Sequence, residues 1–419
     1  MGRRMVGKHL VAIDVGTTKI CVLVAQISSN GHIDVIGMGQ HPSYGLRKGV
    51  VVNLTKTVDS LKRAIAQAES MAGIPIEAAS VGISGGHIKS FNSKGVVAIR
   101  NQEVSQYDIN RVIEAAKAIA IPKDREILHI LPQYFRVDGQ EYVQDSLGMH
   151  GVRLEAQIHI ITGAISSAQN IIKACEATGV RVTDIVLEQI ASADAVLTPT
   201  ERELGVGIID IGGGTSDFAV YKDGRIRHSK VLQIAGNHFT SDLAIGLGVP
   251  IEQAEVLKRS HGFVTEELYL ELEQDSVEVD LGYEGGVKSV DTYSLYEILE
   301  PRAQEVFRLL NDEINEYRLR TFMPSGIVLT GGGSLLSGIS ALASEIFGMN
   351  VRVGIPRGYS NGLEVATISD VLKSPIYATA YGLLVYSLKD RDRSLLTVGS
   401  GSAVKRIFKS MKSWIYDFL

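Results

Sequence analysis

Two short glycine-containing turns carry the residues of this sequence that are best suited to bind phosphate. The first turn begins at Asp14 and the second at Asp210, and each lies between strongly apolar, strand-like runs. Glycine lets a backbone approach an anion without a Cβ in the way, and hydroxyl and ammonium groups can donate further hydrogen bonds to it. The residues that supply these groups are Gly16, Thr17, Thr18, Lys19, Gly212, Gly213, Gly214 and Thr215.

The aspartates that open the two turns add a metal-binding capacity. A carboxylate at Asp14 or Asp210, beside phosphates, is suited to hold Mg²⁺ through water. One such turn alone is weak evidence, because ordinary hairpins also contain Asp, Gly and Thr. Two matched turns, with a third glycine cluster at Gly331, Gly332 and Gly333 after another strand-like run, form a much stronger pattern. Together they predict a nucleotide clamped between two lobes.

Length and composition limit the classes to which the protein can belong. The chain has 419 residues and is 45% hydrophobic, which is enough for two or three compact domains. A net charge of −5 gives no overall cationic field, so we expect no nucleic-acid partner. Cys21 and Cys175 lie in apolar runs and are expected to be buried thiols of a cytosolic protein. The sequence shows no secretory signal, membrane-spanning segment, P-loop or dinucleotide-binding glycine motif.

The elements around the turns follow an α/β rhythm. A strand, a turn and a second strand open the chain, and a helix is expected at Leu54–Ala72, followed by a strand at residues 79–84. At residues 85–161 the pattern changes to short strands around one helix, which indicates an inserted α+β unit. The second half then repeats the opening strand-turn-strand module, so the sequence predicts two similar halves.

The expected domain division has two lobes that the insert interrupts. The pattern at residues 237–320 predicts helices that are rich in charged residues. The loss of hydrophobic periodicity from Lys389 onward predicts a flexible linker. The expected units are residues 1–84 (first lobe), 85–161 (insert), 162–198 (first lobe again), 199–388 (second lobe, with about 371–388 returning to the first), 389–402 (linker) and 403–419 (terminal helix).

The paired motifs resemble those of the actin/Hsp70/hexokinase ATPase family. IDVGTTK and IDIGGGTSD match the two phosphate loops of that family. Its adenosine motif is matched by LTGGGS, with Gly331, Gly332, Gly333 and Ser334. The resemblance implies ribose and adenine contacts from AGNHFTSDL and QAEVLKRSHG, through Gly236, Asn237, Glu255 and Lys258. It also implies an actin-like, two-lobed ATPase fold with duplicated α/β domains, and ATP with Mg²⁺ as cofactors.

Catalysis is less well defined by the sequence than binding. ATP cleavage needs a residue that positions the attacking water. By its position in VLEQIASA, Glu188 resembles the Glu or Gln that actin-like relatives use. The alternative is a carboxylate that is stabilised by the dipole at a helix start. We therefore expect at most slow ATPase activity, or a protein that binds ATP only to fix its shape.

Over nearly its whole length the chain resembles FtsA, a family of bacterial cell-division actins. The similarity includes PSYGLRKG at residues 42–49, the block ELGVGIIDIGGGTSDFAVY and ILEPR at residues 298–302. The resemblance implies filaments, other divisome partners and a peripheral position on the inner face of the cell membrane at the division septum. It further implies that the FtsZ C-terminal tail docks near ILEPRAQEVF, with Arg302 and Glu305 as candidate contacts. The alternative is a surface arginine without a partner role.

Residues 403–419 are expected to form an amphipathic helix. Placed at about 100° per residue, the apolar side chains fall on one face and the cations on the other. A basic and aromatic helix after a linker is typical of segments that lie in a membrane interface among anionic lipids. Packing on the protein's own core is the alternative. The residues expected at the membrane are Val404, Lys405, Arg406, Ile407, Phe408, Lys409, Met411, Lys412, Trp414, Ile415, Phe418 and Leu419.

The sequence leaves functions of different classes open. The leading hypothesis is a structural protein, namely a membrane-tethered, actin-like ATP-binding protein that polymerises and recruits the FtsZ ring. The enzyme alternative is a small-molecule kinase of the same superfamily, which would need an acceptor pocket with a catalytic Asp. A pilus or chaperone relative of the Hsp70 type fits less well, because it predicts no membrane helix or a large substrate domain.

Overall fold

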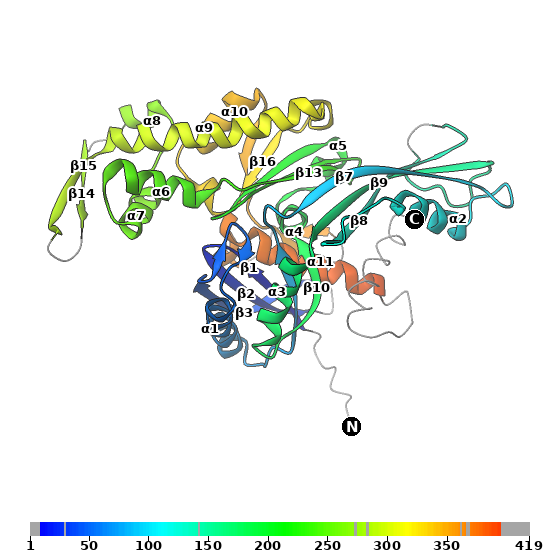
Figure 1. Ribbon diagram of the computed structural model, residues 1–419, viewed down its shortest axis with the longest axis horizontal. Helices are drawn as coiled ribbons and strands as arrows, with labels where there is room; N and C mark the ends of the chain where they lie inside the picture. The colour runs from blue at the N-terminus through cyan, green and yellow to red at the C-terminus, as the bar shows by residue number, and fades with distance from the viewer. Residues whose placement is uncertain are drawn as a thin grey trace.

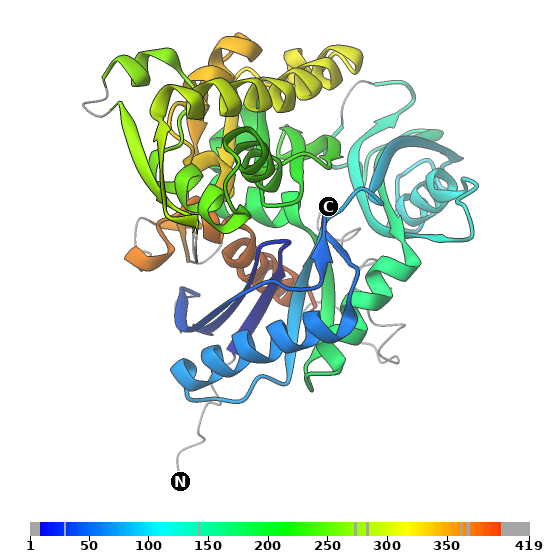
Figure 2. The same cartoon turned by 60° about the vertical axis from the view of Figure 1, so that its left-hand side comes forward.

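A computed structural model describes residues 9–28, 31–140, 143–271, 275–281, 285–360, 363–365 and 369–394. These residues form two lobes and an inserted subdomain that projects to one side (Figure 1, Figure 2). In Figure 1 the first lobe, in blue, lies below, the second lobe, in green to orange, lies above, and the insert, in cyan, lies to the right. Of the helices that the structure describes, none combines the length and the apolar character needed to span a bilayer.

The first lobe is built on a five-stranded sheet with the order β10-β6-β1-β2-β3. Strands β1, β2 and β3 form an antiparallel meander, whereas β6 runs parallel to both β1 and β10. The bounds are β1 His9–Val15, β2 Lys19–Ile27, β3 Ile33–Pro42, β6 Ala78–Ile83 and β10 Arg181–Leu187. A small hairpin of β4 (Leu46–Arg47) and β5 (Val50–Val51) follows β3.

Two helices cover the first sheet. Helix α1 (Leu54–Ala72) packs on β2 and β3, and α3 (Ile165–Glu176) packs on α1 and β10. The predicted start of α1 is confirmed, because the Asn53 side chain accepts a hydrogen bond from the Lys56 N–H at 3.0 Å and so caps the first turn. Both cysteines are buried free thiols in this core, as the sequence predicts.

The second lobe repeats the same topology in a sheet with the order β13-β12-β11-β16-β17. Strands β11, β12 and β13 again form an antiparallel meander, and β16 and β17 extend it in parallel. This repeat confirms the predicted duplication of an α/β unit. The strand bounds are β11 Val206–Ile211, β12 Ser216–Lys222, β13 Arg225–Leu232, β16 Ile327–Thr330 and β17 Val351–Val353.

Residues 237–320 differ from the helical expectation. The helices of the second lobe are α5 Pro199–Leu204, α6 Gly236–Leu247, α7 Ile251–His261, α8 Glu266–Leu270, α9 Thr292–Glu316 and α10 Ile339–Phe347, with 3₁₀ segments η2 Leu319–Phe322 and η3 Gly332–Leu335. However, a hairpin of β14 (Ser276–Asp280) and β15 (Val287–Asp291) interrupts them. Valines that alternate with polar residues favour strands there, and Val279 and Val290 are buried.

Two helices connect the lobes. Helix α4 (Glu188–Val196) contacts strands of both sheets, and α11 (Ala378–Ser394) packs on α4 and on β1, β2 and β6. Their backbones touch at Gly382, where a Cβ would lie 1.8 Å from the Ala191 carbonyl oxygen. The predicted linker begins too early, because α11 continues to Ser394 and the Lys389 ammonium pairs with Asp194 at 2.9 Å. The rest of the predicted linker and the terminal helix lie outside the described residues.

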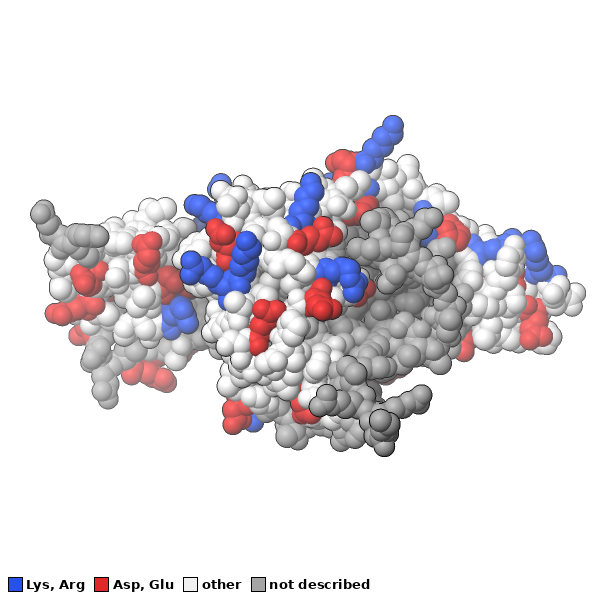
Figure 3. All heavy atoms as spheres, turned by 90° about the horizontal axis from the view of Figure 1, so that it is seen from below, with Lys and Arg blue, Asp and Glu red and all other residues white. Residues whose placement is uncertain are grey.

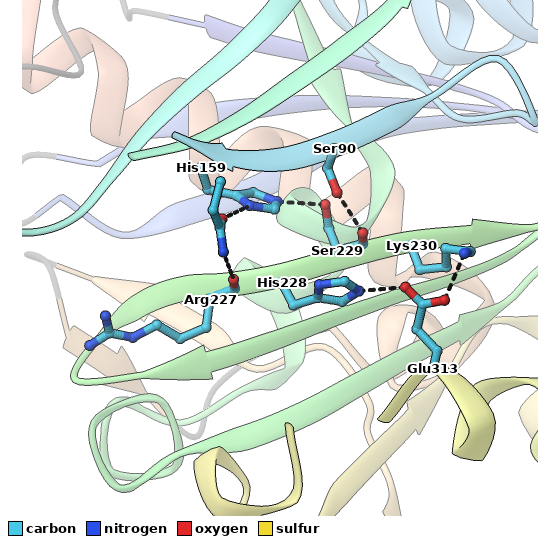
Figure 4. Close-up of polar contacts among 8 residues, drawn as sticks. Ser90, His159, Arg227, His228, Ser229, Lys230 and Glu313 are labelled. Carbon is cyan, nitrogen blue, oxygen red and sulfur yellow. Dashed lines mark hydrogen bonds and ion pairs between the residues drawn. The ribbon is translucent and has the colours of Figure 1, made fainter. Parts of the chain in front are cut away.

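The insert has its own sheet, with the order β7-β9-β8, and its own core beneath one helix. Its elements are β7 Lys89–Ala98, α2 Gln106–Lys117, β8 Arg125–Val137 and β9 Arg153–Ala164. Its contact with strand β13 of the second lobe includes several hydrogen bonds (Figure 4). Ser90 donates to the Ser229 carbonyl at 2.7 Å, and a ring nitrogen of His159 lies 2.9 Å from the Ser229 hydroxyl. On the other side of β13, His228 hydrogen-bonds Glu313 of α9 at 2.8 Å.

The close contact of α4 and α11 gives the first prediction. Gly382→Ala should lower the free energy of unfolding by roughly 1–3 kcal/mol, because the added methyl overlaps a backbone carbonyl that cannot rotate away. Gly246→Ala is the matched control, since that helical glycine faces the flexible end of the Ile298 side chain. Chemical denaturation measures both. Equal stabilities of the two variants would contradict the prediction.

Candidate nucleotide-binding site

The two glycine turns predicted from the sequence meet face to face between the lobes. A Cβ at Gly214 would lie 2.3 Å from the Thr17 hydroxyl, and a Cβ at Gly213 would lie 2.3 Å from the Thr18 methyl group. Side chains at these two positions would push the turns apart. The glycines of the second turn therefore allow the first turn to approach within van der Waals distance.

Each turn joins the central antiparallel strands of its sheet, which gives the two aspartates equivalent positions. Asp14 lies opposite Cys21 in the β1-β2 pair, and Asp210 lies opposite Asp217 in the β11-β12 pair. Both aspartates are buried. The duplicated fold thus brings a carboxylate from each lobe to the same interface, and the second lobe adds Asp217 beside them.

These carboxylates form a negatively charged cluster. Burial is the main cause that raises the pKa of Asp210 to about 6 and that of Asp217 to about 7, and a neighbouring carboxylate contributes to each shift. Burial and the charges of Asp217, Asp14 and Asp210 also raise the pKa of Glu188 well above its usual range. Lys19 offsets part of this charge, because its ammonium lies 3.7 Å from Asp14. The site therefore favours a bound cation.

Two polar contacts in the cluster come from residues that the sequence analysis did not select. The Thr379 hydroxyl, on α11, donates to Asp210 at 3.0 Å. The Ser84 hydroxyl, which follows β6 in the first lobe, donates to Asp217 of the second lobe at 2.5 Å and lies 3.3 Å from the Thr215 hydroxyl. The glycine pair after Ser84, in the run SGG, was the available sequence signal for this loop.

The predicted ribose and adenine contacts lie next to the second turn. The N–H of Gly236, at the start of α6, donates to the Gly212 carbonyl at 3.0 Å, and the next residue, Asn237, bonds the same turn at 2.8 Å. The Lys258 ammonium, on α7, lies 3.2 Å from the Gly236 carbonyl oxygen and 2.5 Å from Glu255. The start of α6 and one face of α7 therefore adjoin the turn.

The predicted adenosine motif reaches the same place from β16. Gly331 has a φ of 80° and lies so near Asp210 that a Cβ would be 2.2 Å from its carboxylate oxygen. The Ser334 hydroxyl donates to the Gly331 carbonyl at 2.7 Å and is buried, while Gly332 and Gly333 open η3. The structure thus brings all predicted nucleotide-binding residues into one region, and Glu188, at the start of α4, lies near the carboxylates of the cluster.

The other predicted site residues lie elsewhere. Arg302, on α9, forms a two-pronged ion pair with Asp242 of α6, at 2.5 and 3.1 Å, and a second ion pair with Glu305. A quarter of the Arg302 side chain is exposed. Residues 403–419, which carry the predicted membrane contacts, lie outside the described residues.

The residues present fit a hydrated Mg²⁺ bound together with a nucleotide. Within the described ranges, no three His, Cys, Asp or Glu side chains are placed to hold a metal ion by themselves. Mg²⁺ usually keeps several waters and binds one or two carboxylates together with substrate phosphates. Asp14 and Asp210 fit that requirement, because burial raises the pKa of each, the charge of Asp14 also raises that of Asp210, and a divalent cation would offset this repulsion.

The duplicated sheets, the facing turns and the insert define the class: the chain has the actin-like ATPase fold. Among solved structures it is similar to the PilM-PilN type IV pilus biogenesis complex, with a TM-score of 0.65 and 16% identity over 90% of this chain and 98% of that chain. It is also similar to MreB5 of Spiroplasma citri bound to ADP, with a TM-score of 0.55 and 14% identity over 93% of this chain and 99% of that chain.

Sequence relatives then identify the family. The model of the SHS2 domain inserted in FTSA matches residues 85–162, and the model of cell division protein FtsA matches residues 207–382. The chain is 43% identical to cell division protein FtsA of Pseudomonas aeruginosa over 98% of both chains. It is 37% identical to that of Escherichia coli over 97% of this chain and 96% of the relative, and 33% identical to that of Bacillus subtilis over 91% and 83%. The chain belongs to the FtsA family of cell division proteins.

The buried carboxylates give a prediction for the nucleotide-free protein. The pKa of Asp210 rises from 3.8 to about 6 on folding, so its ionisation costs stability, and this cost grows as the pH rises from about 4 to 6 and is then constant. Asp210→Asn should therefore stabilise the protein at pH 8, by at most about 3 kcal/mol, and the gain should disappear towards pH 4. Melting curves of wild type and variant between pH 4 and pH 8 measure this difference in stability.

Asp108→Asn is the control, and its expected effect on stability at pH 8 is opposite to that of Asp210→Asn. Hydrogen bonds from Ser105 lower the pKa of Asp108 despite its burial, and the two residues form the capping box of α2. That substitution should destabilise the protein at pH 8. A destabilising effect of Asp210→Asn at pH 8 would contradict the prediction.

Proposed function

We propose that this protein binds ATP with Mg²⁺ between its lobes and acts as a membrane-attached, actin-like component of the division machinery. The observation that carries the nucleotide part is the contact between the two glycine turns, with a buried aspartate in each. In this proposal the turns and Lys19 bind the phosphates, and Asp14 and Asp210 hold Mg²⁺ through water. The predicted ribose, adenine and adenosine contacts are Gly236, Asn237, Glu255, Lys258, Gly331, Gly332, Gly333 and Ser334.

Hydrolysis in this proposal is slow and depends on Glu188. Its position at the start of α4, beside Asp217, is compatible with a water-positioning role. The raised pKa of Glu188 favours its protonated form while the cluster lacks a cation, and a protonated carboxyl group accepts the water's hydrogen bond less well than a carboxylate. Mg²⁺ would supply the compensating charge. Slow turnover fits a protein whose nucleotide sets its shape and its assembly.

Attachment and assembly complete the proposal. Residues 403–419 bind anionic lipid on the inner membrane face at the septum, filaments raise the affinity by multivalency, and the FtsZ tail docks near α9. Arg302 and Glu305 are the proposed contacts there, and the pairing of Arg302 with Asp242 means that a peptide carboxylate would have to share that guanidinium. On the described part of the face in Figure 3, basic and acidic side chains are interspersed, which supports a separate lipid-binding segment.

ATP with Mg²⁺ should raise the melting temperature of the wild-type chain, because a ligand that binds only the folded state adds RT ln(1 + [L]/Kd) of stability. Asp210→Ala should lose most of that rise, and so should wild type in excess EDTA. Asp34→Ala is the control, since Asp34 is an exposed aspartate on β3. An unchanged melting temperature of the wild type with ATP would refute nucleotide binding.

Truncation after Ser402 should abolish sedimentation with anionic vesicles. Trp414→Glu should do the same without unfolding the protein, because an immersed carboxylate costs several kcal/mol. Trp414→Phe, which stays apolar, is the control. Salt should weaken sedimentation only in part, since screening affects the cations and not the apolar contacts. A truncated chain that still sediments as well as the full chain would assign lipid binding to another surface.

A further inference from the structure

The segment PSYGLRKG, at residues 42–49, contains a backbone conformation that is unusual for one of its residues, Lys48. It enters the β4-β5 hairpin, in which Arg47 pairs with Val50, so that Lys48 and Gly49 form the two-residue turn. Both turn residues have positive φ, 50° and 76°. Hairpin turns of this kind favour Asn, Asp or Gly at the first position. A lysine there is strained, and such strain clusters at functional sites.

The tip of this hairpin is fixed against the first phosphate turn. The N–H of Gly49 donates to the Thr17 hydroxyl at 3.0 Å, and the N–H of Ser43 donates to the Thr18 carbonyl at 3.0 Å. On its other side the tip meets the loop after β6, because a Cβ on Gly49 would lie 2.9 Å from the Cα atom of Gly85. The backbone that carries Lys48 is therefore held between two parts of the site.

Lys48 lies at the Glu188 side of the cluster. The carbonyl oxygen of Lys48 is next to Gly85, and the preceding residue, Ser84, donates a hydrogen bond to Asp217. After burial, the charge of Asp217 is the largest cause of the raised pKa of Glu188. If Glu188 positions the attacking water, the terminal phosphate must lie at this side.

Lys48 also lies close enough to the second lobe for its charge to act on a residue there. Burial, and then the charge of Lys48, lowers the pKa of His238 in the first turn of α6. The start of α6 is the segment that hydrogen-bonds the second phosphate turn. Among the residues that the structure describes, no carboxylate forms an ion pair with Lys48, so its three N–H donors are available to a ligand.

We propose that Lys48 binds the terminal phosphate of a nucleoside triphosphate held between the lobes, and thereby favours the triphosphate over the diphosphate. The proposal rests on the nucleotide binding proposed above. A lysine ammonium binds phosphate as a point charge and needs no fixed fork geometry, which suits a single side chain at a hairpin tip. The strained turn is the cost of placing a cation where glycine or asparagine would fit better.

Lys48→Gly tests the proposal without endangering the fold, because glycine adopts a φ of 50° readily. The dissociation constants of ATP and ADP, each with Mg²⁺, are measured by calorimetry for wild type and variant. Loss of the charged hydrogen bond should weaken ATP binding by about ten- to a hundredfold, and ADP binding much less. Lys48→Asn, which also suits the turn, should behave like Lys48→Gly, and Lys48→Arg should recover part of the ATP affinity. Arg47→Gln, which removes one cation from the adjacent position, should leave both constants unchanged.

The outcomes separate this proposal from the one it rests on. Wild type that fails to bind ATP would overturn nucleotide binding and this proposal with it. Wild type that binds ATP, with Lys48→Gly affinities that are unchanged or equally reduced for ATP and ADP, would overturn only the role of Lys48. A melting temperature of Lys48→Gly at or above that of wild type shows that the fold is intact.

Discussion

Thr17 and Thr18 of the first lobe lie directly against Gly213 and Gly214 of the second, and the arrangement of the site depends on this contact. Helix α4 contacts strands of both sheets, and Gly382 lets the backbones of α4 and α11 touch. Glycines form both the contact between the turns and the contact between the helices, so neither contact has space for a larger side chain.

The same contact concentrates negative charge where no water can screen it. Asp14, Asp210 and Asp217 are all buried, and each has a raised pKa. A cluster of this kind reduces the stability of the empty protein, which is common where a site is built for a ligand rather than for the fold. It also explains how a bound cation could draw the lobes together, because neutralising the cluster removes a repulsion that both lobes share.

The insert is attached to this framework in a different way. Its main core is separate, although Leu128, Leu131 and Ile161 join the core cluster of the first lobe. Its contact with β13 uses hydroxyl and amide groups that donate to carbonyls of this edge strand, and an imidazole that hydrogen-bonds a hydroxyl. Polar contacts of this type fix orientation but contribute less stability than an apolar interface. Strand β13 also touches Glu313 of α9 on its other side, so the insert and α9 share one strand as a neighbour.

The sequence by itself determined the duplicated turns, the α/β class and helices such as α1, because local glycine placement, strand-like runs and helical spacing encode them. It also predicted that the two turns lie together, since both halves repeat one motif. It misjudged the β14-β15 hairpin, for which alternating valines were the available local signal, and the end of α11, where the Lys389–Asp194 pair outweighs local pattern. Only the tertiary structure brought Ser84 to Asp217 and Thr379 to Asp210, because these partners lie far apart in the chain and no local pattern pairs them.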